Sequence, residues 1–450
     1  MSDINKKLTI GIFGHYGNCN LGDEAIIEAT IENLRVLRPN VQLYGFSINP
    51  DDTSQRYNIP AYPIRGFIKK KANVKSPDNE NTPTTAQPEV EVAHTQTVHL
   101  PSIKDRLKKI PGLGLGISLL AKSIWLSREI IEEIIFLKAS YKIVKELDIL
   151  MITGSNQFLD NFGGPMGFPY TLLKWSFLAR IAGTKVAYVS VGAGPIYKTA
   201  SKILIRLALL FSNYTSFRDT PSQALIQSFG FKGKSYVYPD LAHSVILNDL
   251  THQKSAVAGK RTVSINPMPV YDSRYWYESN DKLYESYVCK LAGFSAELII
   301  KGHPVFLYAT QPKDENVIDD ILTQVRELGI PEDQVKGMMK KSRDLKTFFE
   351  NLSETDIAVT TRFHGALLAL FAEKPLLAIC YYRKTDDLMK EYGQGASSLV
   401  FEDMTIDEMM EKFSVLEENY EEEKQKIVEK NKIYRERLDE QYLAILDLVG

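Results

Sequence analysis

Short apolar runs alternate with amphipathic stretches through the first half of the chain. Five runs have the length and β-branched content of buried strands: Leu8–Phe13, Val41–Phe46, Ile149–Thr153, Lys185–Val191 and Thr215–Phe217. Four stretches between or after them repeat apolar residues at the period of a helix: Ala25–Leu37, Tyr170–Ala182, Ala200–Phe211 and Pro221–Phe229. Strands that alternate with helices are typical of a parallel sheet that is covered by helices on both faces.

The second half repeats this alternation after a polar stretch, Asn248–Arg261, which contains no aromatic residue. The elements predicted there are strand Val263–Asn266, helix Asp281–Leu291, strand Ala296–Ile300, helix Glu315–Leu328, strand Ile357–Thr360, helix Gly365–Ala372 and strand Leu376–Ile379. We therefore expect an α/β fold with two Rossmann-like domains in a glycosyltransferase-B-like arrangement, and an active site in the cleft between them.

The same pattern predicts where the domains begin and end. Residues 1–247 are expected to form the N-terminal domain, with an insertion at about 72–146, and residues 262–404 the C-terminal domain. Long helices are expected over 405–450, because Thr405 and Glu408 form a capping box and residues 417–448 are charged and amphipathic. In folds of this kind the last helix often crosses back to the first domain.

The insertion combines two kinds of sequence. Residues 72–101 are rich in Thr, Pro, Asn, Glu and Gln and contain no Phe, Tyr or Trp, which predicts a disordered segment. Residues 104–109 are basic, and residues 110–126 are mostly apolar. The 104–126 stretch therefore predicts either a helix that packs on its own domain or a peripheral contact with a membrane.

Composition narrows the class of protein. The formal net charge is −2, with 54 Lys and Arg against 56 Asp and Glu, which argues against nucleic-acid binding through bulk charge. The three cysteines (Cys19, Cys289 and Cys380) are far apart and fit a reducing cytosol. The first residues do not have the pattern of a signal peptide, and no run is long and apolar enough for a transmembrane helix. We expect a cytoplasmic protein, at the inner face of the membrane if the 104–126 stretch binds lipid.

Candidate chemistry lies where the strand 357–360 gives way to a helix. Arg362 and His364 fall at the carboxyl end of this strand, the edge at which open α/β sheets bind ligands, and the helix N-terminus favours an anion there. A fixed cation two residues from an imidazole suits an anionic substrate that must gain a proton. The alternative is structural, with Arg362 in a local ion pair and His364 capping the helix.

A glycine-rich turn follows the first strand and includes Gly14, Gly17 and Gly22. Glycines at such a turn let the backbone approach a ligand closely. Their spacing is neither that of a dinucleotide fingerprint nor that of a P-loop, so a tight turn without a ligand is an equal alternative.

Four motifs occur in a fixed order: Asn20-x-Gly-Asp-Glu after the first strand, Arg218-Asp219 in mid-chain, Pro239-Asp240-Leu-Ala, and Arg362-x-His364 before an Ala/Leu helix. This series resembles the polysaccharide pyruvyl transferase family. The resemblance implies transfer of the enolpyruvyl group of phosphoenolpyruvate to a sugar of a cell-surface polysaccharide or lipid-linked glycan, usually as a ketal across two hydroxyls. It implies no cofactor beyond this donor substrate.

The resemblance also implies roles for single residues. Arg218 and Arg362 are expected to hold the donor's phosphate and carboxylate, because guanidinium groups match both bidentately. His364 is expected to carry the proton. Further substrate-binding candidates are Gly14, His15, Asn20 and Asp23 on the acceptor side, and His303 and Lys384 on the donor side. No His, Cys or carboxylate set has metal-ligand spacing, so we expect no metal.

Two departures from the family pattern leave alternatives open. Phe363 stands where the family commonly has an aliphatic residue, and Gly154-Ser-Asn-Gln157 stands where it often has a glycine-rich turn, which leaves the acceptor sugar open. The alternatives are a glycosyltransferase that uses a nucleotide sugar and a non-catalytic glycan-binding relative. The run Tyr381-Tyr-Arg-Lys384 suits a small dianion better than a ribose, although Asp386 and Asp387 are close by.

Overall fold

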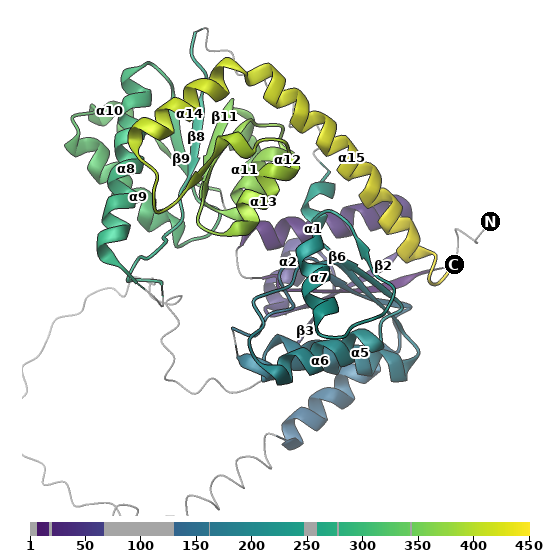
Figure 1. The fold of residues 1–450 in the computed structure, drawn as a ribbon. Helices are drawn as coiled ribbons and strands as arrows, with labels where there is room; N and C mark the ends of the chain where they lie inside the picture. The colour runs from purple at the N-terminus through teal and green to yellow at the C-terminus, as the bar shows by residue number, and fades with distance from the viewer. Residues whose placement is uncertain are drawn as a thin grey trace, which may run out of the picture. The chain divides into compact units, whose positions relative to one another are not determined.

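The computed structural model describes residues 7–17, 20–66, 130–161, 163–246, 259–276, 279–342 and 344–450. Residues Met1–Ile64 and Ile143–Gly450 form one compact unit, and Arg65–Lys142 form a second. The first unit contains two sheets with helices around them (Figure 1). The predicted segments 72–101 and 104–126, and most of the predicted linker 248–261, lie outside the described residues.

The N-terminal sheet has seven strands in the order β3-β2-β1-β4-β5-β6-β7, and all its described neighbours pair in parallel. Its strands are β1 (Thr9–Phe13), β2 (Gln42–Ser47), β3 (Ala61–Pro63), β4 (Ile149–Thr153), β5 (Lys185–Val191), β6 (Tyr214–Phe217) and β7 (Tyr236–Val237). Its helices are α1 (Leu21–Leu37), α2 (Pro50–Tyr57), α5 (Phe168–Ala182), α6 (Thr199–Leu210) and α7 (Thr220–Ser228), with a 3-10 turn, η2, at Leu241–Ser244. We call these elements the N-terminal lobe.

The C-terminal sheet has six strands in the order β10-β9-β8-β11-β12-β13, again paired in parallel. Its strands are β8 (Val263–Asn266), β9 (Val305–Tyr308), β10 (Met339–Lys340), β11 (Ile357–Thr360), β12 (Leu376–Cys380) and β13 (Ser398–Val400). Its helices are α8 (Asp281–Ile300), α9 (Asp314–Glu327), α10 (Glu332–Val335), α11 (Leu345–Ser353), α12 (Phe363–Phe371), α13 (Arg383–Glu391) and α14 (Ile406–Glu418). We call these elements the C-terminal lobe.

Both sheets have the doubly wound strand order. In each lobe the first strand (β1 or β8) lies inside the sheet. The next two strands are added on one side of it and the remaining strands on the other. A switch point therefore lies between β1 and β4, and another between β8 and β11. Ligands of such sheets bind outside the carboxyl ends of the strands at the switch point. The prediction of two Rossmann-like α/β halves is confirmed.

One predicted strand is wrong. Residues 296–300 continue α8, and the strand lies further on, at Val305–Tyr308. The reason is visible in the burial: Leu291, Phe294 and Leu298 are buried at helical spacing, whereas Ile300 is exposed. An apolar run of this length fits a helix end as well as a strand, and only its continuity with the preceding turns decides between them.

The last helix, α15 (Tyr420–Leu446), contacts both lobes (Figure 1). Near its middle, Asn431 donates to the carbonyl oxygens of Leu370 and Phe371 at the end of α12. Near its end, Gln441 donates to the Ser216 hydroxyl in β6 at 2.8 Å. The predicted return of the last helix to the first lobe is therefore observed, and the Thr405 cap of α14 is formed as predicted, with the Glu408 N–H donating to its hydroxyl.

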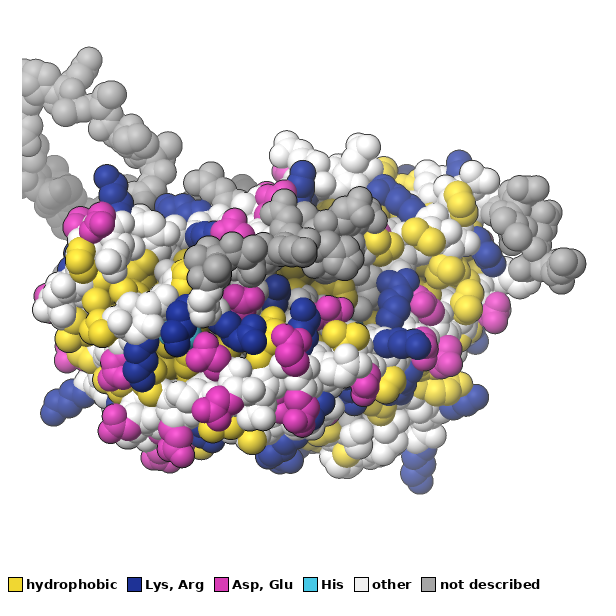
Figure 2. Space-filling model, turned by 90° about the horizontal axis from the view of Figure 1, so that it is seen from above, with side chains coloured by type: hydrophobic (Ala, Val, Ile, Leu, Met, Phe, Trp, Pro, Cys, Tyr) yellow, Lys and Arg dark blue, Asp and Glu magenta, His cyan; other side chains and the backbone are white. Residues whose placement is uncertain are grey.

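The surface carries both signs of charge. Figure 2 shows Lys and Arg side chains interspersed with Asp and Glu on the face that it presents. Among the described residues, no helix has the length and apolar character that crossing a bilayer requires.

Candidate functional site

The two lobes meet where α1 and α12 begin. The Leu21 N–H donates to the Thr310 carbonyl, which follows β9, at 3.2 Å. Gly22 lies directly against the imidazole of His364, and a Cβ at this position would overlap the ring. The glycine of the Asn-x-Gly-Asp-Glu motif is thus explained by the close approach of a side chain from the other lobe.

The glycine-rich turn is tied down by its own hydrogen bonds. The Gly14 N–H donates to the Phe46 carbonyl at 3.1 Å, and the Gly17 N–H, at a φ of 83°, donates to Glu24 at 3.0 Å. Asn20 caps α1 by accepting from the Gly22 N–H, and its amide donates to Asp23 at 2.8 Å. These bonds fix the first turn of α1 and, with it, the carboxylate of Asp23.

Asp23 is buried beside two histidines. Its Oδ2 lies 3.5 Å from Nδ1 of His15, whose side chain is 35% exposed and packs on Phe168. Burial works to raise the pKa of Asp23, but the His15 contact and the nearby charge of His364 outweigh it and hold the pKa below its usual value. Asp23 is therefore a fixed negative charge at the junction of the lobes.

His364 lies in the first turn of α12, after the N-cap Arg362. Its Nε2 is buried and has no hydrogen-bond partner among the described residues. Burial lowers the pKa of His364, Asp23 and Asp240 act to raise it, and Arg218 and Lys384 lower it further. One hydrogen-bonding position of the imidazole is thus unused by the described residues, and the role of His364 as a proton carrier stays a prediction.

Arg218 follows β6 and points into the same region. Its Nη1 donates to the buried Asp240 at 3.2 Å and its Nε to Asp219 at 3.4 Å. Its guanidinium lies 5.1 Å from the ring centre of Phe363, which also has the ammonium of Lys384 at 5.6 Å. Phe363, between Arg362 and His364, thus brings a cation from each lobe to one aromatic ring.

Lys384 lies in the first turn of α13. Its side chain lines the cavity described below and remains accessible to solvent there. Burial, followed by repulsion from Arg218, lowers the pKa of Lys384 to about 8, against the attraction of Asp219, Asp240 and Asp23. An anion that binds near these two cations therefore competes with the carboxylates of Asp219 and Asp240.

Arg362 forms an ion pair with Asp314. Its Nε donates to both carboxylate oxygens of Asp314, at 2.8 and 2.7 Å, and its Nη2 also bonds to Asp314, which has no exposed surface. Asp314 in turn accepts from the N–H groups of Thr310 and Gln311. An ion pair, the alternative that the sequence left open, therefore occupies the Nε and Nη2 edge of the guanidinium, and the contact of Arg362 with the donor stays a prediction.

His303 differs from its prediction. It precedes β9, so it lies at the amino edge of the sheet, away from the cleft. Its Nδ1 is 3.0 Å from the Arg261 carbonyl, and its ring packs on Phe413 of α14. The misplaced strand 296–300 led to this error, since a strand there would have put His303 at the carboxyl edge.

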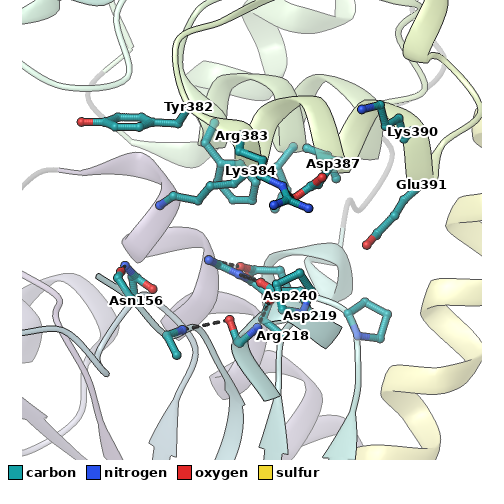
Figure 3. A pocket seen from close by; sticks show the side chains of 18 of the residues that line it. Asn156, Arg218, Asp219, Asp240, Tyr382, Arg383, Lys384, Asp387, Lys390 and Glu391 are labelled. Carbon is teal, nitrogen blue, oxygen red and sulfur yellow. Dashed lines mark hydrogen bonds and ion pairs between the residues drawn. The ribbon is translucent and has the colours of Figure 1, made fainter. Parts of the chain in front are cut away.

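A cavity of about 710 Å³ is lined by Arg218, Lys384 and Phe363. Of the described residues discussed above, His364, Asp23 and Arg362 are not among those that line it. Figure 3 shows Arg218, Asp219 and Asp240 from the N-terminal lobe facing Arg383, Lys384 and Asp387 from the C-terminal lobe across it. Phe363, Leu367 and Tyr434 add apolar surface. Within the described ranges no cluster of three His, Cys or carboxylate side chains is arranged to hold a metal ion.

Sequence reasoning missed two residues that shape the site. Asp314 and Thr310 follow β9, a strand that the sequence did not reveal, so their position at the carboxyl edge was not foreseen. A correct strand at Val305–Tyr308 would have pointed to both residues.

Comparison with solved structures establishes the fold. The UDP-GlcNAc 2-epimerase of Neisseria meningitidis bound to UDP-GlcNAc is similar at a TM-score of 0.54, with 12% identity over 96% of this chain and 99% of that one. A glycosyltransferase of Rickettsia africae ESF-5 gives 0.54, with 10% identity and 99% of both chains covered. The N-terminal domain of Candida albicans trehalose-6-phosphate phosphatase gives 0.53, with 11% identity over 99% and 97%. These likenesses show the fold, which is the predicted glycosyltransferase-B-like one.

Sequence comparison establishes the family. The model of the polysaccharide pyruvyl transferase family matches residues 20–381, and the chain belongs to this family of transferases. The resemblance drawn from the four motifs is confirmed. A search of curated proteins found no match.

Proposed function

We propose that this protein transfers the pyruvyl group of phosphoenolpyruvate to a sugar of a cell-surface polysaccharide or lipid-linked glycan, forming a pyruvate ketal. The observation that carries the proposal is the meeting of Arg218 and Lys384 on one aromatic ring beside the partnerless Nε2 of His364. Family membership supports the same chemistry.

The donor binds between the two cations. Phosphoenolpyruvate carries a phosphate and a carboxylate, so Arg218 from one lobe and Lys384 from the other balance its charge. The contacts of Arg218 with Asp240 and Asp219, at 3.2 and 3.4 Å, are longer than strong charged hydrogen bonds, so a ligand can compete for them. Arg362 holds the loop after β9 through Asp314 and acts on the donor indirectly.

His364 moves the proton. It donates to C3 of the enol, and C2 becomes an oxocarbenium-like electrophile. A sugar hydroxyl attacks C2 and transfers its proton to His364, which restores the imidazolium. The bond between C2 and the phosphate oxygen then breaks, and a second hydroxyl closes the ring. One hydroxyl proton ends on C3 and the other on phosphate, so the reaction needs no oxidant, reductant or cofactor.

The acceptor occupies the rest of the cavity. Its volume of about 710 Å³ is in the range that holds a drug-sized ligand, which leaves room for sugar next to a donor as small as phosphoenolpyruvate. Asn156, Asp219 and Asp387 line it and offer amide and carboxylate groups to sugar hydroxyls. The described residues Gly14 and His15 do not line this cavity, and their contact with the acceptor stays a prediction. Because phosphoenolpyruvate is a cytoplasmic metabolite, the proposal implies a cytoplasmic enzyme.

The rival reading is a glycosyltransferase that uses a nucleotide sugar, since the similar epimerase is bound to UDP-GlcNAc. Phosphate release separates the two. The protein is incubated with phosphoenolpyruvate and a panel of sugar acceptors, and in parallel with UDP-sugars and the same acceptors. Acceptor-dependent release of inorganic phosphate, lost in His364→Gln, supports the proposal. Release of UDP with no phosphate from phosphoenolpyruvate would overturn it in favour of the rival.

A further inference from the structure

Two buried groups from different lobes lie together at the site, and the proposed reaction uses only one of them. His364 opens α12 in the C-terminal lobe, and Asp23 lies in the first turn of α1 in the N-terminal lobe. Gly22, the residue before Asp23, contacts the His364 ring so closely that a methyl group would not fit between them. Asp23 Oδ1 and His364 Nε2 are both buried, and neither has a hydrogen-bond partner among the described residues.

We propose that Asp23 is a positioning residue for His364: its carboxylate, fixed by Asn20, supplies from the opposite lobe negative charge that favours the protonated imidazole, the form that delivers a proton. The kinetic part of this inference rests on the proposed function, while the charge interaction itself does not. Asn20 holds Asp23 at 2.8 Å, so the carboxylate keeps its place without His364 having to bond to it. Nε2 therefore stays open to the substrate.

The charges around His364 explain why such a residue is required. Arg218, at the end of β6, and Lys384, on α13, both disfavour the imidazolium, as does burial. Asp23, on α1, and Asp240, before η2, favour it, and Asp23 has the larger effect of the two. A site that gathers cations to bind a dianion would thus leave its own general acid deprotonated unless carboxylates offset them.

Asp23 and Asp240 are not equivalent. Asp240 is bonded to Arg218 at 3.2 Å, so its charge is already shared with a cation. Asp23 contacts His15 and Asn20 and has no arginine or lysine partner in the described part of the chain. Since α1 and α12 belong to different lobes, Asp23 favours the protonated form of His364 only when the two helix N-termini are in contact.

The test uses the full-length protein and begins without substrate. The pH titration of His364 is followed by NMR in ¹³C-histidine-labelled protein, its signal being the one lost in His364→Gln. In Asp23→Asn the midpoint moves to lower pH. Asp51→Asn, which removes an exposed carboxylate in the first turn of α2, leaves it in place. An unchanged midpoint in Asp23→Asn would overturn the proposal, whatever substrate the enzyme uses.

Steady-state kinetics are the second test. Asp23→Asn lowers kcat at neutral pH by roughly 10- to 100-fold, part of the 10²–10⁴-fold that a general acid contributes. KM for phosphoenolpyruvate changes much less, because Arg218 and Lys384 are intact. Lowering the assay pH restores part of the rate, which a misfolded site would not do, and Asp23→Glu retains more activity than Asp23→Asn. A uniform loss at every pH would overturn the proposal, whereas a moved midpoint without any turnover in the wild type would overturn only the proposed function.

Discussion

Arg362 and Asp314 form a buried ion pair that connects the start of α12 to the start of α9. Nε bonds to both carboxylate oxygens and Nη2 to one, while the Arg362 side chain is 12% exposed and that of Asp314 is 0% exposed. Asp314 also accepts from the N–H groups of Thr310 and Gln311, and the Thr310 carbonyl accepts from Leu21 in the other lobe. The pair therefore fixes the loop after β9, whose Thr310 carbonyl contacts the N-terminal lobe.

Removal of the Arg362 side chain should lower the free energy of unfolding, because it breaks the buried ion pair with Asp314. Arg362→Ala leaves the Asp314 carboxylate buried and uncompensated, which costs about 3–5 kcal/mol. Asp314→Asn should cost less, because the amide still accepts from the backbone and Arg362 reaches solvent. Urea unfolding of the two single variants and the Arg362→Ala/Asp314→Asn double variant measures the interaction. Additive losses would mean that the pair does not act as a unit.

The ion pair also shows where sequence reasoning stops. Strands β4, β5, β8 and β11 were predicted with their observed bounds because each is a short run rich in apolar and β-branched residues in a parallel sheet. Strand β9 was not, since its four residues follow Pro304 and an apolar run that belongs to α8. The motifs indicated Arg218, His364 and Lys384, but the carboxylate that occupies Arg362 comes from 48 residues away and depends on packing.

Binding of phosphoenolpyruvate should weaken above about pH 8. The lowered pKa of Lys384, about 8, means that its ammonium loses its proton as pH rises through this value, and the neutral amine no longer attracts phosphate. KM should then rise by about tenfold per pH unit above that point. In Lys384→Met KM should be raised by about 10- to 100-fold at neutral pH, the loss of one charged hydrogen bond, and this rise with pH should disappear.

The exposed Lys346 of α11 provides a matched control, since Lys346→Met removes the same charge far from the cavity. Initial rates with varied donor between pH 6.5 and 9.5 provide the measurement. A pH profile of KM in Lys384→Met that follows the wild type would assign the titration to another group.

Acid should destabilise the fold through His243. This residue of η2 is buried, with Nδ1 at 3.2 Å from the Tyr392 hydroxyl and its ring against Tyr434 of α15. Burial lowers the pKa of His243 from 6.5 to about 4, despite Asp240. The unfolded state therefore binds the proton first, so stability falls as pH drops from 6.5 to 4, by roughly 3 kcal/mol at about 1.4 kcal/mol per unit. The free energy of unfolding is measured in urea at pH 4 and at pH 7. In His243→Gln the difference between the two values should be smaller by this amount.

Glu28 of α1 acts in the opposite direction over the same range. Burial, followed by repulsion from Glu32, Asp344 and Glu24, raises the pKa of Glu28 to about 7. Its protonated form favours the fold, so its contribution is present below pH 4.5 and is lost as pH rises to 7. In Glu28→Gln the free energy of unfolding should therefore decrease more as pH falls than in the wild type, whereas in His243→Gln it should decrease less. If both variants changed the slope in the same direction, the assignment to His243 would be wrong.

Gly22→Ala should reduce turnover while leaving the fold and donor binding nearly intact. Gly22 has ordinary helical backbone angles in the first turn of α1, so alanine fits the backbone and is preferred in a helix by about 1 kcal/mol. Its Cβ would overlap the His364 ring near the base of that side chain, which forces the imidazole away from its place. Because general acid catalysis depends on position, kcat should fall by at least about 10-fold. Arg218 and Lys384 are untouched, so KM for phosphoenolpyruvate should change little.

Gly337→Ala is the matched control, since a Cβ there meets nothing within 4 Å. Steady-state kinetics and thermal melts of both variants decide the matter: equal kcat values would show that the contact between Gly22 and His364 does not set the position of the proton carrier.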